Sequence, residues 1–349
     1  MANKPMTPRQ RVMTALRHHE PDRVPIDLGG FATNMQVRAQ DELKKYLEIK
    51  GDTKAFVRQH AEPDEAILER FKIDTRYVRT IPLNKSELDT NNSYVDDWGV
   101  KHRMAPSSHY YDVVEFPLAN ASSVSDLRNY DWPDPTDQRR VAGLREKARH
   151  LFQNSNYAIV ADAPKLGIFE MAWLLVGFEK FLIELSCNTN FVRYLLNKIT
   201  ELEIALYDTF LSRVKDYIHV VAVSDDLGTQ DNLMISPELY KSSIKPLHKK
   251  FWQFVKDKSN AYLFLHCCGS IKKLISDFIE LGVDILNPVQ VSAVDMDSKE
   301  LKQEFGHEIT FWGGGFIFAP VHNIQPNVPP ENIVTMFQTA LEHGCYESR

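Results

Sequence analysis

The residues with the clearest chemical potential are a histidine and a cysteine at the end of one predicted strand. The apolar run 262–265 leads into His266, and Cys268 follows two positions later. Residues two apart in an extended chain point the same way, so both side chains can reach one metal ion. Zinc takes nitrogen and sulfur ligands. The pair is less than a complete site, and Cys267 should face the opposite side as a small buried hydrophobe.

Two carboxylates follow the preceding predicted strand. Asp225 and Asp226 come directly after the apolar run 218–224. Such a pair can bind a metal, act as a base or cap the next helix, and turn formation explains Asp225 alone equally well. Because the next strand carries His266 and Cys268, we favour a catalytic role for the pair. Asp226, or else Asp225, is the candidate oxygen ligand to zinc.

Further polar side chains follow the other predicted strands. Asn287 and Gln290 offer amides to a substrate, although an Asn-Pro turn is an equal alternative, and Gln230 joins them from the Asp226 loop. Trp312 precedes glycines that allow close approach to a ligand. His322, after the last strand, is a candidate third metal ligand or a substrate contact.

The composition is that of a globular protein. The 349 residues carry a net charge of −6, so nothing draws the whole chain to nucleic acid. No window of ~20 apolar residues predicts a membrane span. Of four cysteines, two are adjacent, which is a poor disulfide framework and favours a reducing cytoplasm. The motifs G-x-G-x-x-G, G-x-S-x-G and H-E-x-x-H are missing, which disfavours nucleotide enzymes, serine hydrolases and zincins.

Strands and helices alternate along the chain. Apolar runs begin near residues 24, 73, 157, 218, 262, 283, 309 and 316, with helical periodicity between most of them. Eight such units predict an α/β fold, a (β/α)8 barrel whose chemistry lies at the carboxyl ends of the strands. We expect one domain over residues 1–349. Residues 93–137 form an insertion, a hairpin followed by a segment that wraps the surface.

One connection is too short for this barrel. Only residues 313–315, all glycine, separate Trp312 from Phe316. A parallel crossover needs at least ~10–12 residues. Either 309–319 is a single strand with a bulge, or a βα unit is shortened near 313–315.

Taken together, these motifs resemble the uroporphyrinogen decarboxylase superfamily, in its branch of corrinoid-linked, zinc-dependent methyltransferases. The segments that carry the resemblance are TPRQRV (7–12), HEPDRVP (19–25), DWG (97–99), GIFE (167–170), DDLGTQ (225–230), HCCGS (266–270), NPVQ (287–290) and PVHNIQ (320–325).

The resemblance implies a barrel and a methyltransferase. Zinc, held by His266 and Cys268, activates a thiol that takes the methyl group of a methyl-corrinoid on a partner corrinoid protein. Some relatives run the transfer in the other direction, from a small methylated donor. The resembled enzymes supply a second cysteine from the last strand, where this chain has only glycines, so Asp226 or His322 would be the third ligand. We expect a monomer or a homodimer.

Two alternatives remain. Uroporphyrinogen decarboxylases proper need no metal, lack H-x-C and carry an arginine-rich run where this chain has residues 26–30. Their catalytic aspartate has its nearest match in Asp74. Arg76 and Arg79 would have to hold substrate carboxylates, and a salt-bridged structural role suits them equally. The second alternative is a degenerate barrel that binds a corrinoid or tetrapyrrole without catalysis.

Overall fold

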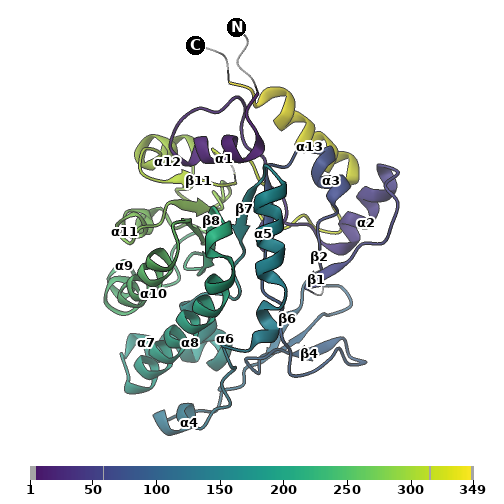
Figure 1. Ribbon diagram of the computed structural model, residues 1–349. Helices are drawn as coiled ribbons and strands as arrows, with labels where there is room; N and C mark the ends of the chain where they lie inside the picture. Colours follow the sequence, from purple (N-terminus) through teal and green to yellow (C-terminus); the bar gives the residue numbers. More distant parts are fainter. Residues whose placement is uncertain (1–4, 58, 314–315, 347–349) are drawn as a thin grey trace.

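A parallel sheet forms the centre of the computed structural model, which describes residues 5–57, 59–313 and 316–346 (Figure 1). Its strand order is β11-β10-β9-β8-β7-β3, and each neighbouring pair is parallel. The strands are β3 (Thr75–Val78), β7 (Ala158–Ala161), β8 (Val220–Ser224), β9 (Tyr262–His266), β10 (Ile285–Asn287) and β11 (Thr310–Phe311). All residues of β7, β8 and β10 are buried, as expected when both faces of a parallel sheet are covered.

The strand register aligns the predicted site residues. Ser224 at the end of β8 lies opposite His266 at the end of β9, and His266 lies opposite Asn287 at the end of β10. The loops that leave these three strands therefore start at one edge of the sheet. This is the carboxyl edge at which the sequence predicts the chemistry.

Helices surround the sheet (Figure 1). The α-helices are α1 (Pro8–Leu16), α2 (Val37–Tyr46), α3 (Glu65–Arg70), α4 (Val124–Arg128), α5 (Leu144–Asn154), α6 (Ile168–Val176), α7 (Phe178–Ser186), α8 (Asn190–Val214), α9 (Pro237–Leu239), α10 (Lys245–Lys258), α11 (Ile275–Glu280), α12 (Ser298–Phe305) and α13 (Pro330–His343). Short 3-10 turns are η1 (Gln138–Val141), η2 (Lys215–Tyr217) and η4 (Lys272–Leu274). No helix among the described residues is both long enough and apolar enough to cross a membrane.

A π-helical segment, η3 (Tyr240–Ile244), joins α9 to α10. The backbone N–H of Lys245 donates to the carbonyl of Tyr240, five residues back. Pro246 follows and has no N–H to continue a regular α-helical ladder. A proline in a helix is a common cause of such a distortion, which the sequence predicts here as a kink.

The predicted first and last strands do not form regular ladders in the described residues. Isolated parallel bridges pair Ile26 with Phe318 and Trp312 with Ile317. The N–H of Asp27 donates to Phe318 O at 2.8 Å. The hydrogen bonds thus establish an α/β fold around a six-stranded parallel sheet, but not the eight-stranded barrel. Residues 314 and 315 of the predicted short link lie outside the described residues.

The predicted hairpin is part of a separate antiparallel sheet of order β4-β5-β6. Its strands are β4 (Ser93–Val95), β5 (Lys101–Arg103) and β6 (Asp112–Glu115), while a further antiparallel pair joins β1 (Ala55–Val57) to β2 (His60–Ala61). The third strand and α4 fall within 105–137, where the sequence predicts only a surface wrap. Asp96 makes the turn, because its carboxylate accepts from the N–H groups of Trp98 and Val100.

Candidate metal centre

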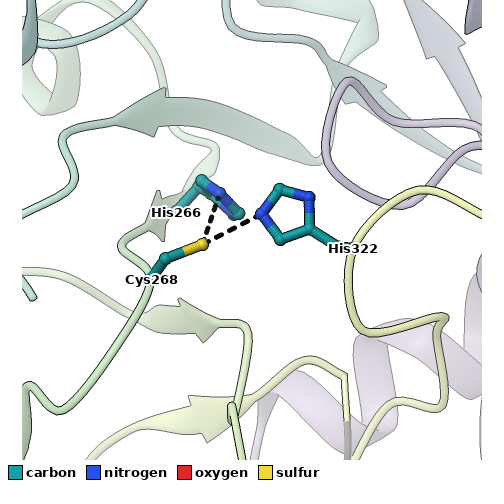
Figure 2. A group of neighbouring side chains, drawn as sticks. All are labelled: His266, Cys268 and His322. Atoms are coloured by element: carbon teal, nitrogen blue, oxygen red, sulfur yellow. Dashed lines mark hydrogen bonds between the residues drawn. The ribbon is translucent and has the colours of Figure 1, made fainter. Parts of the chain in front are cut away.

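Three side chains at the carboxyl edge of the sheet converge on one point (Figure 2). The Sγ of Cys268 lies 3.3 Å from Nε2 of His266 and 3.0 Å from Nε2 of His322. All three ligand atoms lie within 4.8 Å of one another. The structure thus brings together the two residues of the H-x-C motif and a histidine more than fifty positions further along the chain.

Different elements position the three ligands. His266 is the last residue of β9, and Cys268 lies in the loop that follows. His322 has a left-handed backbone, with φ of 66°. The next residue anchors its loop, because Asn323 accepts from the N–H of Asn34 at 2.8 Å and donates to the carbonyl of Phe31 at 3.1 Å. The loop that carries His322 is therefore held by the segment after the predicted first strand.

Asn287 determines which nitrogen of His266 is available to a metal. Its side-chain Nδ2 donates to the carbonyl of Trp312 at 2.8 Å, so its Oδ1 faces Nδ1 of His266 at 2.7 Å. An amide oxygen only accepts, so Nδ1 must carry the proton and Nε2 must offer a lone pair. Metal-binding histidines usually have such an acceptor on the other ring nitrogen. Asn287, predicted to bind substrate, has its amide engaged by His266 and by the carbonyl of Trp312 in this structure.

Asp226 lies at the edge of this group. Its Oδ1 accepts from the backbone N–H of Cys268 at 2.7 Å and lies 3.9 Å from Nε2 of His266. Burial, and then the carboxylates of Asp226 and Glu170, raise the pKa of the Cys268 thiol. A cation would reverse this balance, since a metal-bound thiol loses its proton. Asp226 thus fixes the cysteine loop, but among the described residues it is not part of the group whose ligand atoms lie within 4.8 Å of one another.

The donor set suits zinc. Ligands at ~2.0–2.3 Å from a tetrahedral ion lie roughly 3.3–3.8 Å from one another. The distances of 3.3 and 3.0 Å between sulfur and the two nitrogens come close to this range. Catalytic zinc ions have three protein ligands and keep one position for substrate. His266, Cys268 and His322 would be those three ligands.

Asp225 does not join the group. Its two oxygens accept from the N–H groups of Phe169 and Glu170, each at 2.9 Å, so it caps the first turn of α6. Nε2 of His248 lies 2.8 Å from the same carboxylate, and both side chains are 1 % exposed. Successive residues of an extended chain face opposite sides, so Asp225 points away from Asp226 into the helix layer. The predicted catalytic role does not fit this position.

The other predicted substrate ligands are engaged within the protein. Gln290 accepts from the N–H of Gly269 at 3.0 Å and donates to Gln230 at 2.8 Å. Gln230 in turn donates to the carbonyl of Ser292. Trp312 is fully buried, and its indole N–H donates to Asp27 at 2.9 Å. These residues hold the loops around Cys268 and the interior of the sheet.

Glu170 has a role that sequence reasoning did not assign. Its Oε2 accepts from the backbone N–H of Asp226 at 3.1 Å, behind the metal group. Burial, and then the charges of Asp226 and Asp225, raise its pKa well above the ordinary value. In the sequence, the GIFE segment (167–170) stands out only through the family resemblance. The buried glutamate at the start of an otherwise apolar helix was the available signal.

Both the sequence and the fold are similar to those of known proteins. The sequence profile of the family described as "Uroporphyrinogen decarboxylase (URO-D)" matches residues 103–314. A solved structure of a methyltransferase from Methanosarcina mazei is similar with a TM-score of 0.64 and 18% identity, over 97% of this chain and 99% of that one. No curated protein matches the sequence. At 18% identity, the structural similarity supports a shared fold and nothing more.

Proposed function

The chain belongs to the uroporphyrinogen decarboxylase family, and we propose that within it the protein is a zinc-dependent methyltransferase. It would transfer a methyl group between a methyl-corrinoid on a partner corrinoid protein and a small thiol, or another small acceptor or donor. The observation that carries the proposal is the convergence of His266, Cys268 and His322 at the carboxyl edge of the sheet.

Asn287 and Asp226 hold His266 and the Cys268 loop in an arrangement suited to zinc binding. Asn287 holds the proton of His266 on Nδ1 and leaves Nε2 for the metal. Asp226 holds the cysteine loop through the N–H of Cys268. A zinc ion bound there would lower the pKa of a substrate thiol, so that a thiolate is present at neutral pH. In the proposed reaction the thiol sulfur gains the methyl group, cobalt keeps the electron pair of the Co–C bond, and the thiol proton is released.

We also propose that the sheet closes into the eight-stranded barrel predicted from the sequence. Segments around Ile26 and Phe318 bridge each other, and Ile26 O accepts from the N–H of Asp74 next to β3 at 2.8 Å. The bridge from Trp312 to Ile317 reaches the other edge of the sheet. A closed sheet would put His322 across the barrel mouth from His266.

Uroporphyrinogen decarboxylation is less well supported. Asp74 is fully buried between Arg11 and Arg23, whose side chains bond it at 2.5 and 2.8 Å. Arg76 pairs with Glu65 at 2.5 Å, and Arg79 is likewise engaged by carboxylates. These arginines are therefore neutralised, whereas binding a polycarboxylate needs cations free to pair with it.

Metal analysis tests the proposal. We expect one zinc per chain after reconstitution, and severe loss of zinc affinity in H266A, C268A and H322A. The matched controls are H150A and C187A, which change exposed residues outside the group and should bind zinc normally. Methylcobalamin consumption with a small thiol then tests the reaction. Unchanged zinc binding in the three variants would refute the site, and zinc binding without methyl transfer to any thiol would favour the degenerate barrel.

A further inference from the structure

A cavity of about 210 Å³ lies beside the candidate metal group. Phe31 forms part of its wall, and the same ring meets the ring of His266 edge-on, with 5.1 Å between centroids. His60 lines the cavity as well and is an electrostatic neighbour of His322. Pockets for drug-sized ligands measure ~300–1,000 Å³, so this space suits a smaller molecule. None of His266, Cys268 and His322 lines the cavity itself, which adjoins them through Phe31 and His60.

The charged groups of the cavity wall neutralise one another. Arg79 donates to Asp162 at 3.1 Å and to Glu62 at 3.0 Å, and its third nitrogen bonds the carbonyl of Gly29. Lys165 donates to Asp96 at 2.9 Å. An anionic ligand would have to take a cation from its partner, and a cationic ligand would compete with these same cations for the carboxylates. Either exchange leaves a buried charge unpaired, which is costly.

Unlike these paired charged side chains of the cavity wall, His60 has a polar atom that lacks a partner among the described residues. Its Nε2 is closed off from solvent and has no hydrogen-bond partner among the described residues. Burial, with the nearby His322 and Arg79, lowers the pKa of His60 to about 4, so the ring is neutral at pH 7. A buried polar atom without a partner costs free energy that a hydrogen bond would recover. His60 lines the cavity, and the terminal torsion of histidine is soft, so binding here requires that the ring turn its Nε2 toward the ligand.

We propose that this cavity binds the non-reacting part of the methyl acceptor or donor, and that this part is uncharged and carries one hydrogen-bonding group, such as a hydroxyl, for His60. The apolar wall around Phe31 and Leu166 receives its carbon atoms. His60 is then a specificity-determining residue of the proposed reaction. This inference rests on the proposed function and adds the class of substrate.

Four small thiols that differ only in their tails test the inference on the zinc-loaded protein. The probes are 2-mercaptoethanol, its near-isostere 1-propanethiol, the anion 3-mercaptopropionate and the cation cysteamine, with methylcobalamin as methyl donor. We expect 2-mercaptoethanol to have the lowest KM, roughly three- to tenfold below that of 1-propanethiol, as one neutral hydrogen bond would give. Calorimetric titration with the same thiols should give the same order of affinity.

The variant H60F distinguishes a failure of this inference from a failure of the proposed function. It should bring the ratio of KM values for 1-propanethiol and 2-mercaptoethanol to about one, while H150F, on the exposed face of α5, leaves the ratio unchanged. Tightest binding of a charged thiol, or an unchanged ratio in H60F, would overturn the inference while methyl transfer stands. If no thiol is methylated, the proposed transfer to a thiol fails, and the order of affinities in calorimetry, compared between H60F and the wild type, still decides the inference.

Discussion

At the scale of single residues, the orientation of His266 depends on one amide. In N287L the ring loses the acceptor for its Nδ1 proton, and the tautomer with Nε2 free is no longer favoured. Loss of such a partner typically lowers metal affinity by ~10–100-fold. We expect a decrease of this size in N287L, measured by competition with a zinc-binding dye.

The control for this variant is N154L. Asn154 also bonds a histidine, His150 at 3.1 Å, but on the exposed end of α5. The zinc affinity of N154L should equal that of the wild type. Equal affinity in N287L would mean that packing alone fixes the ring of His266.

Part of the candidate site follows from local sequence and part does not. His266 and Cys268 are predictable because the side-chain alternation of one strand puts them on the same side. The same alternation predicts that the side chains of Asp225 and Asp226 face opposite sides. Which helix Asp225 caps depends on the tertiary structure, so it cannot be predicted from the alternation. The sequence predicts Asn287 as a polar group at the carboxyl edge of the sheet. Its partners come from two other segments, so its role could not be read from spacing.

At the scale of elements, two loops meet in close contact at glycines. A Cβ on Gly228 would lie 2.6 Å from the carbonyl oxygen of Cys268, and one on Gly269 would lie 2.5 Å from the backbone of Gly228. The loops after β8 and β9 therefore pack backbone to backbone, which side chains would prevent. The position of Cys268 depends on this packing.

The substitution G228A tests that dependence. The added methyl group must push the Cys268 loop outward, and we expect zinc affinity to fall at least tenfold with a loss of stability of about 1–3 kcal/mol. G143A is the comparison, because no atom lies within 4 Å of its new Cβ but its φ of 70° costs about 1–2 kcal/mol. That protein should lose stability and keep its zinc affinity. Parallel losses of affinity in both variants would show that the loop contact is not what matters.

The elements themselves were largely predictable. The apolar runs near residues 157, 218 and 262 predict β7, β8 and β9. The apolar periodicity of residues 330–343 predicts a helix, and α13 has these bounds. Apolar periodicity over 167–187 predicts a single helix, whereas in the structure Gly177, with a φ of 92°, ends α6 before α7 begins. Apolar periodicity runs through that glycine and hides the break. The third strand of the small sheet has the sequence DVVE, which does not alternate between apolar and polar residues, so no strand pattern predicts its pairing with β5.

At the scale of the whole molecule, one buried acid should make stability depend on pH. Glu203 on α8 is 1 % exposed, and neither carboxylate oxygen has a hydrogen-bond partner among the described residues. Burial is the main cause that raises its pKa from 4.5 to about 8; Asp225 and Asp97 act in the same direction, and Lys165 opposes them. The folded protein thus keeps a proton that the unfolded chain releases.

The direction in which stability changes with pH follows from the number of protons that each state binds. Between pH 4.5 and about 8 the folded state binds more protons at Glu203 than the unfolded state, so the free energy of unfolding falls as pH rises through this range. E203Q removes the titration and keeps the shape. Denaturant unfolding at pH 5, 7 and 8.5 should show a smaller decline in E203Q than in the wild type, by a few kcal/mol across the range. Histidines titrate in both proteins, so only the difference between the two curves reports on Glu203. Parallel curves would mean that this carboxyl group is ionised in the folded protein or finds a partner there.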